Sequence, residues 1–375
     1  MTHHRITFAA LAALALIAPA VPATAAHHRL PDRPRGVPSP APTQVLALDG
    51  PRGVDALGGG RTLVAENDGS FSLVIDRRHD DARKIALSSV PATGIAPAIS
   101  GGPHGSVYVL TGAGAEPGGP PIPGAATLYR WRPGDAEPSV VADIAAYQAT
   151  DPDPDDQEGQ PADSNPFGVL ALRNGDVLVS DAAGNDVLRV HGDGTIETVA
   201  RLRPRTVLVP EGLPPGTPPA GTPIVSEAVA TSIAVDRRGD LYIGELRGFP
   251  ATPGTSQIWR VPVGSTDAVC DPADPQHGAC QRVADGLTSI VDLAADGRGS
   301  IYAVSLSAKS WLAMELGVPG ADVGSLLRVR PCRGSRELFT GSLTLPGGVD
   351  VAGNDLYLTG PVFGPGALSR ARLRP

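Results

Sequence analysis

The chain repeats one pattern six times, and this repetition limits the folds that are open to it. The two clearest copies are GVLALRNGDVLVSDAAGNDVLRV, beginning at Gly168, and SIAVDRRGDLYIGELRGFPATPGTSQIWRV, beginning at Ser232. Each copy reads as two apolar strands joined by a tight glycine turn, then a variable loop and two further strands. The other copies begin near residues 53, 98, 292 and 348.

Four antiparallel strands in each of six copies predict an all-β, six-bladed β-propeller. The sixth copy ends after its third strand, LSRARL, and a strand without a partner, QVLALD from Gln44, precedes the first copy. We expect this N-terminal strand to close the last blade, because a closed ring leaves no long exposed edge.

The N-terminus predicts export. A short basic start precedes an apolar run that ends near a small-residue cleavage site at Ala25. We therefore expect a secretory signal peptide at 1–25, a Pro-rich leader at 26–43 and the propeller at 44–375. No other apolar run is long enough to span a bilayer, so the mature protein is expected to be secreted without membrane insertion.

The net charge of the chain is −8, and this limits the kinds of partner that it is expected to bind. The sequence has more acidic than basic residues and no run of basic ones, so nucleic acid and anionic membrane surfaces are not expected as partners. We expect a monomer whose partner is a small molecule, a glycan or a protein.

The longer signatures resemble the ScyD/ScyE family of exported bacterial proteins, whose units are similar to NHL repeats. The resemblance covers nearly all of the mature chain. It is carried by DIAAYQATDPDPDD with DSNPFGVLALRNGDVLVSDAAGNDVLRV, by EAVATSIAVDRRGDLYIGELRGFP and by LTSIVDLAADGRGSIYAVS. It implies a secreted propeller and carries over no catalytic residue. The chain departs from the family pattern at Ala230, Ser305 and Gly360.

Propeller connectivity predicts where ligands bind. Loops between second and third strands share one face with loops between blades, and we call this the upper face. All five long insertions are expected on it: 112–126, 145–164, 203–228, 247–256 and 306–323. Long loops on one face of a rigid scaffold usually mark a binding face, although length drift in Pro- and Gly-rich loops is the alternative.

Acids end three of the second strands, namely Glu66, Asp181 and Glu245. In a shared mouth they could bind a hard cation such as calcium or perform acid–base chemistry. The alternative is structural: they could pair with the arginine that recurs on each third strand, or accept hydrogen bonds from turn N–H groups.

Polar residues just before the innermost strands are the better site candidates, because they approach the axis outside the repeat pattern. Capping of the strand ends is the alternative. The candidates are Asp163, Ser164 and Asn165 before the third blade, Thr231 and Ser232 before the fourth, and Asp292 with Thr288 and Ser289 before the fifth.

The acidic stretch DPDPDDQEGQPADSNPFG, residues 151–168, begins like an EF-hand calcium loop. Asp156 stands where that loop needs Gly, and Ala162 stands where it needs Glu. We therefore expect a solvated acidic loop on the upper face, with weak calcium binding as the alternative.

If the chain is exported, its three cysteines are in an oxidising compartment. Cys270 and Cys280 flank one loop, and we expect a disulfide between them. Cys332 is then free, or it competes for one of these partners.

Two functions remain open from the sequence, and enzymatic activity is undecided. The first is a non-catalytic binding or accessory protein that uses the upper face. The second is a calcium-assisted hydrolase or lactonase at the channel mouth, which needs several convergent ligands and a base. Thr111, Ser305 and Gly360 interrupt the ring of acids, and this favours binding.

Overall fold

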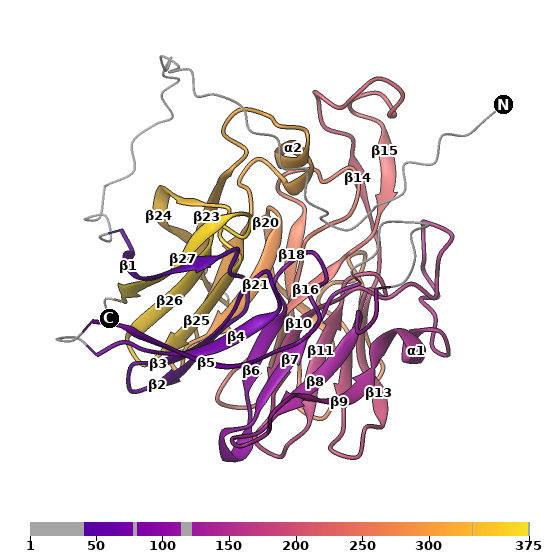
Figure 1. Cartoon of the computed structure of the whole chain (residues 1–375). Helices are drawn as coiled ribbons and strands as arrows, with labels where there is room; N and C mark the ends of the chain where they lie inside the picture. The colour runs from indigo at the N-terminus through magenta and orange to yellow at the C-terminus, as the bar shows by residue number, and fades with distance from the viewer. Residues whose placement is uncertain (1–40, 78–80, 114–121, 332, 374–375) are drawn as a thin grey trace.

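The computed structural model describes residues 41–77, 81–113, 122–331 and 333–373 (Figure 1). The expected signal peptide, nearly all of the expected leader and Cys332 lie outside these residues. Within the described part of the chain, no helix is long and apolar enough to cross a membrane.

Six antiparallel sheets form the blades, one for each sequence repeat. The first two blades are β2 (Val54–Gly58), β3 (Arg61–Ala65), β4 (Ser70–Ile75) and β5 (Arg83–Ser89), then β6 (Ala98–Gly101), β7 (Val107–Leu110), β8 (Thr127–Trp131) and β9 (Ser139–Asp143), with a 3-10 turn at Pro103–Gly105. The next two are β10 (Pro166–Ala171), β11 (Val177–Asp181), β12 (Asp186–Val190) and β13 (Ile196–Leu202), then β16 (Ala230–Val235), β17 (Leu241–Glu245), β18 (Ser256–Val261) and β20 (Gln281–Leu287). The last two are β21 (Ile290–Ala295), β22 (Ile301–Ser305), β23 (Val323–Arg330) and β24 (Gly334–Thr344), then β25 (Gly348–Ala352), β26 (Asp355–Gly360) and β27 (Pro365–Arg372).

The innermost strands form a ring around the molecular axis. β2, β6, β10, β16, β21 and β25 contact one another in this order, and β25 returns to β2. The six-bladed β-propeller expected from the repeat is therefore confirmed.

The N-terminal strand closes the ring as expected. β1 (Thr43–Asp49) pairs antiparallel with β27 and becomes the outer strand of the sixth blade. A second contact supports the closure, because the Thr359 hydroxyl donates to the Arg52 carbonyl at 2.7 Å.

Packing between blades forms the core. Strands inside a propeller are covered on both faces by neighbouring blades, so they read as continuous apolar runs. Leu178 of β11, Ile243 of β17 and Trp259 of β18 are fully buried in the cluster between the third and fourth blades. The turns that join first to second strands place Gly175 at φ 96° and Gly239 at φ 89°, where only glycine is free of strain.

The segment after β18 is more than the turn that the repeat predicts. Within it, β19 (Ala268–Cys270) pairs parallel with β13 and gives the third blade a fifth strand. The Sγ atoms of Cys270 and Cys280 lie 1.95 Å apart, which is the arrangement of a disulfide. The repeat could not show this pairing, because β19 joins the neighbouring blade rather than its own.

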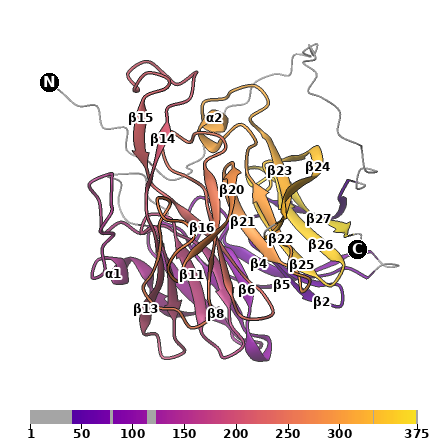
Figure 2. The same cartoon turned by 180° about the vertical axis from the view of Figure 1, so that it is seen from behind.

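The long insertions gather on one face. The hairpin of β14 (Arg205–Leu208) and β15 (Pro223–Ser226) projects on the same side as α2 (Trp311–Glu315) (Figures 1 and 2). The insertion at 145–164 carries α1 (Ile144–Gln148) at its start. Contacts link the insertions in sequence: Ala113 N to Asn165 Oδ1 at 3.1 Å, Gln157 N to Glu227 Oε1 at 2.6 Å, Thr252 Oγ1 to Leu208 O at 2.7 Å, and Trp311 Nε1 to Arg247 O at 2.9 Å.

Candidate functional site

An apolar pocket opens at the upper end of the axis. Its empty volume is about 340 Å³, and its surface is almost entirely apolar. The lining residues come from the starts of innermost strands and the ends of second strands, which meet at the upper face. They are Arg52, Ile95, Ala96, Phe167, Val291, Leu306, Gly347, Val362 and Phe363.

A second cavity, the axial channel, continues along the innermost strands. Its empty volume is about 710 Å³, and it shares Arg52, Phe167, Val291 and Gly347 with the upper pocket. More than half of its surface is polar. The charged residues that line it are Arg52, Asp55, Asp292 and Asp350.

Asp55 and Asp350 face each other across the junction of the first and last blades. Asp55 Oδ2 accepts from Gly101 N at 2.7 Å and from Ser100 Oγ at 3.1 Å, whereas Asp350 Oδ2 accepts from Ala56 N at 2.6 Å. The two carboxyl groups also hydrogen-bond to each other, and burial raises the pKa of both. Two carboxyl groups in such contact share a proton.

Asp292 lies on the wall formed by the fifth blade. It accepts from Val349 N at 2.7 Å and from Leu293 N at 2.9 Å. Burial raises its pKa to about 7, although these backbone donors and the charge of Arg52 act in the opposite direction. Asp292 therefore changes its charge near neutral pH.

Arg52 separates the pocket from the channel. Its Nε donates to Ala96 O and its Nη1 to Phe167 O, both at 2.8 Å. The guanidinium carbon lies 4.2 Å from the centre of the Phe167 ring, which adds a cation–π contact. Burial lowers the pKa of Arg52 to about 10, so the side chain still carries a proton at neutral pH.

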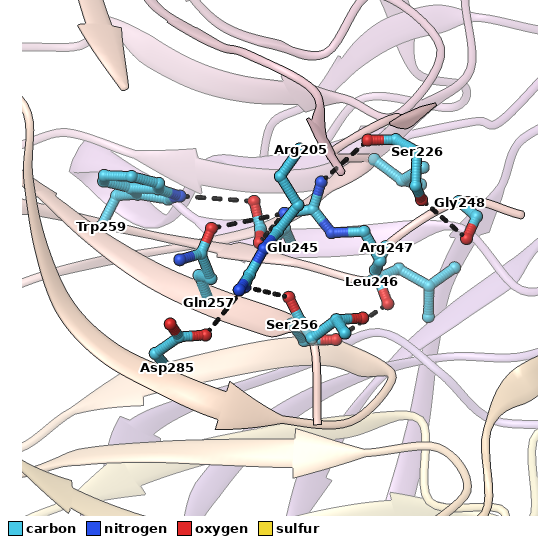
Figure 3. Close-up of polar contacts among 12 residues, drawn as sticks. Arg205, Ser226, Glu245, Leu246, Arg247, Gly248, Ser256, Gln257, Trp259 and Asp285 are labelled. Atoms are coloured by element: carbon cyan, nitrogen blue, oxygen red, sulfur yellow. Dashed lines mark hydrogen bonds and ion pairs between the residues drawn. The ribbon is translucent and has the colours of Figure 1, made fainter. Parts of the chain in front are cut away.

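Glu245 lies in a buried network away from both cavities (Figure 3). It forms an ion pair with Arg247 and accepts from Trp259 Nε1 at 3.3 Å. Arg247 in turn donates to Ser226 O of β15 at 3.1 Å. The expectation that Glu245 lines the channel mouth is wrong in this respect, because its oxygens hold the β14–β15 hairpin against the fourth blade.

The other two acids of the ring cap loops. Asp181 accepts from Ser164 Oγ at 2.6 Å and from Asn165 N at 2.7 Å, and it also accepts from the N–H groups of the turn after β11. Glu66 accepts from Asp49 N at 2.9 Å and pairs with Lys84. Asp181 and Glu66 therefore follow the structural alternative, in which the acids accept hydrogen bonds from the N–H groups of turns and loops.

The alternative pairing with the repeated arginines is wrong. Arg260 pairs with Asp240, and Arg370 pairs with Asp76. Neither of these acids ends a second strand. Arg189 pairs with Glu197 and Arg328 with Asp296, so these four recurrent arginines are neutralised by acids other than Glu66, Asp181 and Glu245.

The candidates before the innermost strands divide into two groups. Thr231 and Asp292 line the channel, and Thr231 Oγ1 donates to Ile290 O at 2.8 Å across two blades. Ser232 is fully buried beside Gly244, and Asp163 is exposed on the loop before β10. Of the nine site candidates, the structure brings only Thr231 and Asp292 to the axis; Ser164, Asn165, Asp163, Ser232, Glu66, Asp181 and Glu245 lie outside both cavities.

Sequence reasoning missed Asp55, Asp350, Ser100 and Arg52. A signal existed, because GVD occurs at Gly53 in the first repeat and again at Gly348 in the last. The strand registers place Asp55, Ser100 and Asp350 opposite equivalent residues of their second strands. The acids predicted as a ring lie at the ends of second strands, whereas Asp55 and Asp350 lie within the innermost strands.

The described residues do not assemble a metal site. Nowhere among them do three His, Cys, Asp or Glu side chains come together so that they could hold a metal ion. A calcium ion, which these acids could have bound, therefore has no ligand set at Glu66, Asp181 and Glu245, because their oxygens bind the protein itself.

Comparisons with known proteins identify the class of fold. No family model matches the chain, and no curated protein matches it. Among solved structures, the PQQ-bound form of an aldose sugar dehydrogenase from Streptomyces coelicolor superposes with a TM-score of 0.53 at 14% identity, over 88% of this chain and 96% of that chain. A glucose dehydrogenase gives 0.54 at 13%, over 89% and 100%. A gluconolactonase from Xanthomonas campestris gives 0.49 at 12%, over 90% and 99%. The similarity to the two dehydrogenases, both at a TM-score above 0.5, is one of fold alone.

Proposed function

We propose that this protein is a secreted, non-catalytic binding or accessory protein of the ScyD/ScyE type that takes a small molecule in its upper pocket. The observation that carries this proposal is the apolar pocket on the axis. Its lining is almost entirely apolar, as the linings of small-molecule sites usually are. Burial of an apolar ligand there removes apolar surface from water, which is the main source of its binding free energy.

The position of the pocket supports the same function. The insertions gather around the upper end of the axis, and hydrogen bonds tie them to one another. When a ligand binds to a largely preformed pocket, less free energy is spent on ordering the side chains and loops of the protein. The hydrogen bonds of Arg52 to Ala96 and Phe167 hold the floor of the pocket in place.

The alternative of a calcium-assisted hydrolase or lactonase is less well supported. Such an enzyme needs several ligands and a base that converge on one point. Glu245 and Asp181 have no exposed surface, and their oxygens accept hydrogen bonds from the protein.

The proposal is tested by titrating the purified protein with indole, a neutral apolar probe, and by filling the pocket. Ile95→Trp adds volume at a lining residue, and we expect it to weaken indole binding by about tenfold or more, since about 1.4 kcal/mol corresponds to tenfold. The matched control is Leu208→Trp, because Leu208 is 57% exposed on the β14–β15 hairpin. Equal binding by the wild type and Ile95→Trp, or no binding at all, contradicts the proposal.

A further inference from the structure

The axial channel has features that the proposed function does not use. Asp55, Asp292 and Asp350 project into one cavity from the first, fifth and sixth blades, which are neighbours in the ring. Among the lining residues, Arg52 is the one basic side chain. The wall therefore carries three acids against one cation.

Arg52 supplies a second, independent observation. The residue is 7% exposed, and its Nε and Nη1 donate to carbonyl oxygens. Within the described residues, its Nη2 donates no hydrogen bond to the protein, and the side chain forms no ion pair. A buried guanidinium that retains an unused donor provides a place for an anionic or accepting group of a ligand.

We propose that the axial channel binds a small organic zwitterion, with its ammonium group at the Asp55–Asp350 pair and its anionic group at Arg52. This site is distinct from the upper pocket, and it does not depend on the function proposed for that pocket. The ligand class follows from the two kinds of unmatched group in one cavity. A lone anion would meet three carboxyl groups, and a lone cation would leave Arg52 Nη2 without an acceptor.

The alternatives fit the channel less well. A metal ion would need three convergent ligands, which the described residues do not provide. A purely apolar molecule would give Arg52 Nη2 no acceptor and the carboxyl groups no further donor, while it displaced the water that can supply both. An ammonium group can instead donate three hydrogen bonds to carboxylate oxygens.

Zwitterion binding is expected to release protons. Burial raises the pKa of Asp55, Asp350 and Asp292, so protons bind to these acids more tightly in the empty channel than they would in water. An ammonium group beside them favours the ionised form. The charged groups that face this site are Asp55 on β2, Asp350 on β25, Asp292 on β21 and Arg52 before β2. Affinity should therefore rise as the pH increases from 6 to 8.

The test uses calorimetric titration of the purified protein with the unbranched ω-amino acids from glycine to 6-aminohexanoate. Butylamine and butanoate serve as probes that each lack one charged end. We expect one chain length to bind at least about tenfold more tightly than either single-ended probe, because the amino acid forms charge-assisted hydrogen bonds at both ends of the site and each probe forms them at one end. Proton release should be visible as a dependence of the binding heat on the buffer. Equal affinity for butylamine and the best amino acid, or no binding by any amino acid, would overturn the proposal.

Two variants separate a specific site from general attraction. Asp350→Asn and Asp55→Asn retain an acceptor oxygen for Ala56 N and Gly101 N, so the fold should tolerate them. We expect both to lose about tenfold or more in amino-acid affinity and to retain indole binding in the upper pocket. Asp193→Asn, in the exposed turn between β12 and β13, is the matched control. Unchanged amino-acid affinity in Asp350→Asn and Asp55→Asn overturns the proposal.

Discussion

Buried charge in this propeller has two different uses at the scale of single residues. In the network of Glu245 and Arg247, acid and base neutralise each other away from any cavity. In the axial channel, Asp55 and Asp350 are held as a proton-sharing pair, and Arg52 retains an unused donor. The first arrangement stabilises the fold, and the second leaves groups that a ligand can satisfy.

The buried ion pair gives a stability prediction. Arg247→Ala leaves the carboxylate of Glu245 without its counter-ion in a dry site, and we expect a loss of about 3–5 kcal/mol in the free energy of unfolding. Arg203→Ala is the control, because the side chain of Arg203 is 48% exposed and its pair with Asp271 should contribute about 0–1 kcal/mol. Urea unfolding measures both. Losses of equal size in the two variants would mean that the buried pair contributes no more to stability than the exposed pair.

Asp292 gives a prediction about pH. Its pKa is raised by burial to about 7 from an ordinary value of 3.8, so the folded chain binds this proton more tightly than the unfolded chain. The contribution of Asp292 to stability is therefore greatest below pH 4 and is lost as the pH rises to 7. Asp292→Asn should remove this dependence. Compared with the wild type, the variant should gain in free energy of unfolding between pH 4 and pH 7, and a constant difference over this range contradicts the assignment.

At the scale of elements, the repeat predicts nearly all of the blades because each strand has the same role in every copy. The sequence also predicts the closure by β1, since the last copy lacks its fourth strand. It could not predict β19 or the β14–β15 hairpin, because these pair outside the repeat. The candidate site was harder to predict: Asp181 and Ser164 were expected at the axis but bond to each other, while Asp55 lies within a strand.

Ring closure can be tested at β1. Leu48 is 6% exposed and packs in the cluster between the first and sixth blades. We expect Leu48→Ala to lower the free energy of unfolding by about 2–5 kcal/mol, since it deletes a buried side chain and leaves a cavity. Gln44→Ala, an exposed position on the same strand, should change it by less than about 0.5 kcal/mol. Similar effects of the two substitutions would argue against a closing role for β1.

The disulfide that we expect between Cys270 and Cys280 is tested by alkylation without a reductant, followed by mass measurement of the intact chain. One modified cysteine per chain is the expected result, because the chain has three cysteines and two of them form the Cys270–Cys280 disulfide. Modification of all three cysteines contradicts it.

At the scale of the whole molecule, closing six blades into a ring creates the two axial cavities. Innermost strands from every blade contribute to the channel wall, so residues far apart in the chain meet there: Asp55 and Asp350 are the clearest case. The upper pocket lies at one end of the same axis, between the starts of innermost strands and the ends of second strands. The scaffold thus brings an apolar site and a charged site together along one line.

The most direct test of the account is a crystal structure of the protein grown with indole. We predict indole in the upper pocket, in contact with Phe167 and Val362 and above Arg52. An empty pocket at saturating indole, or indole bound only on the outer surface of the blades, would contradict the central claim that the upper pocket on the axis is the binding site.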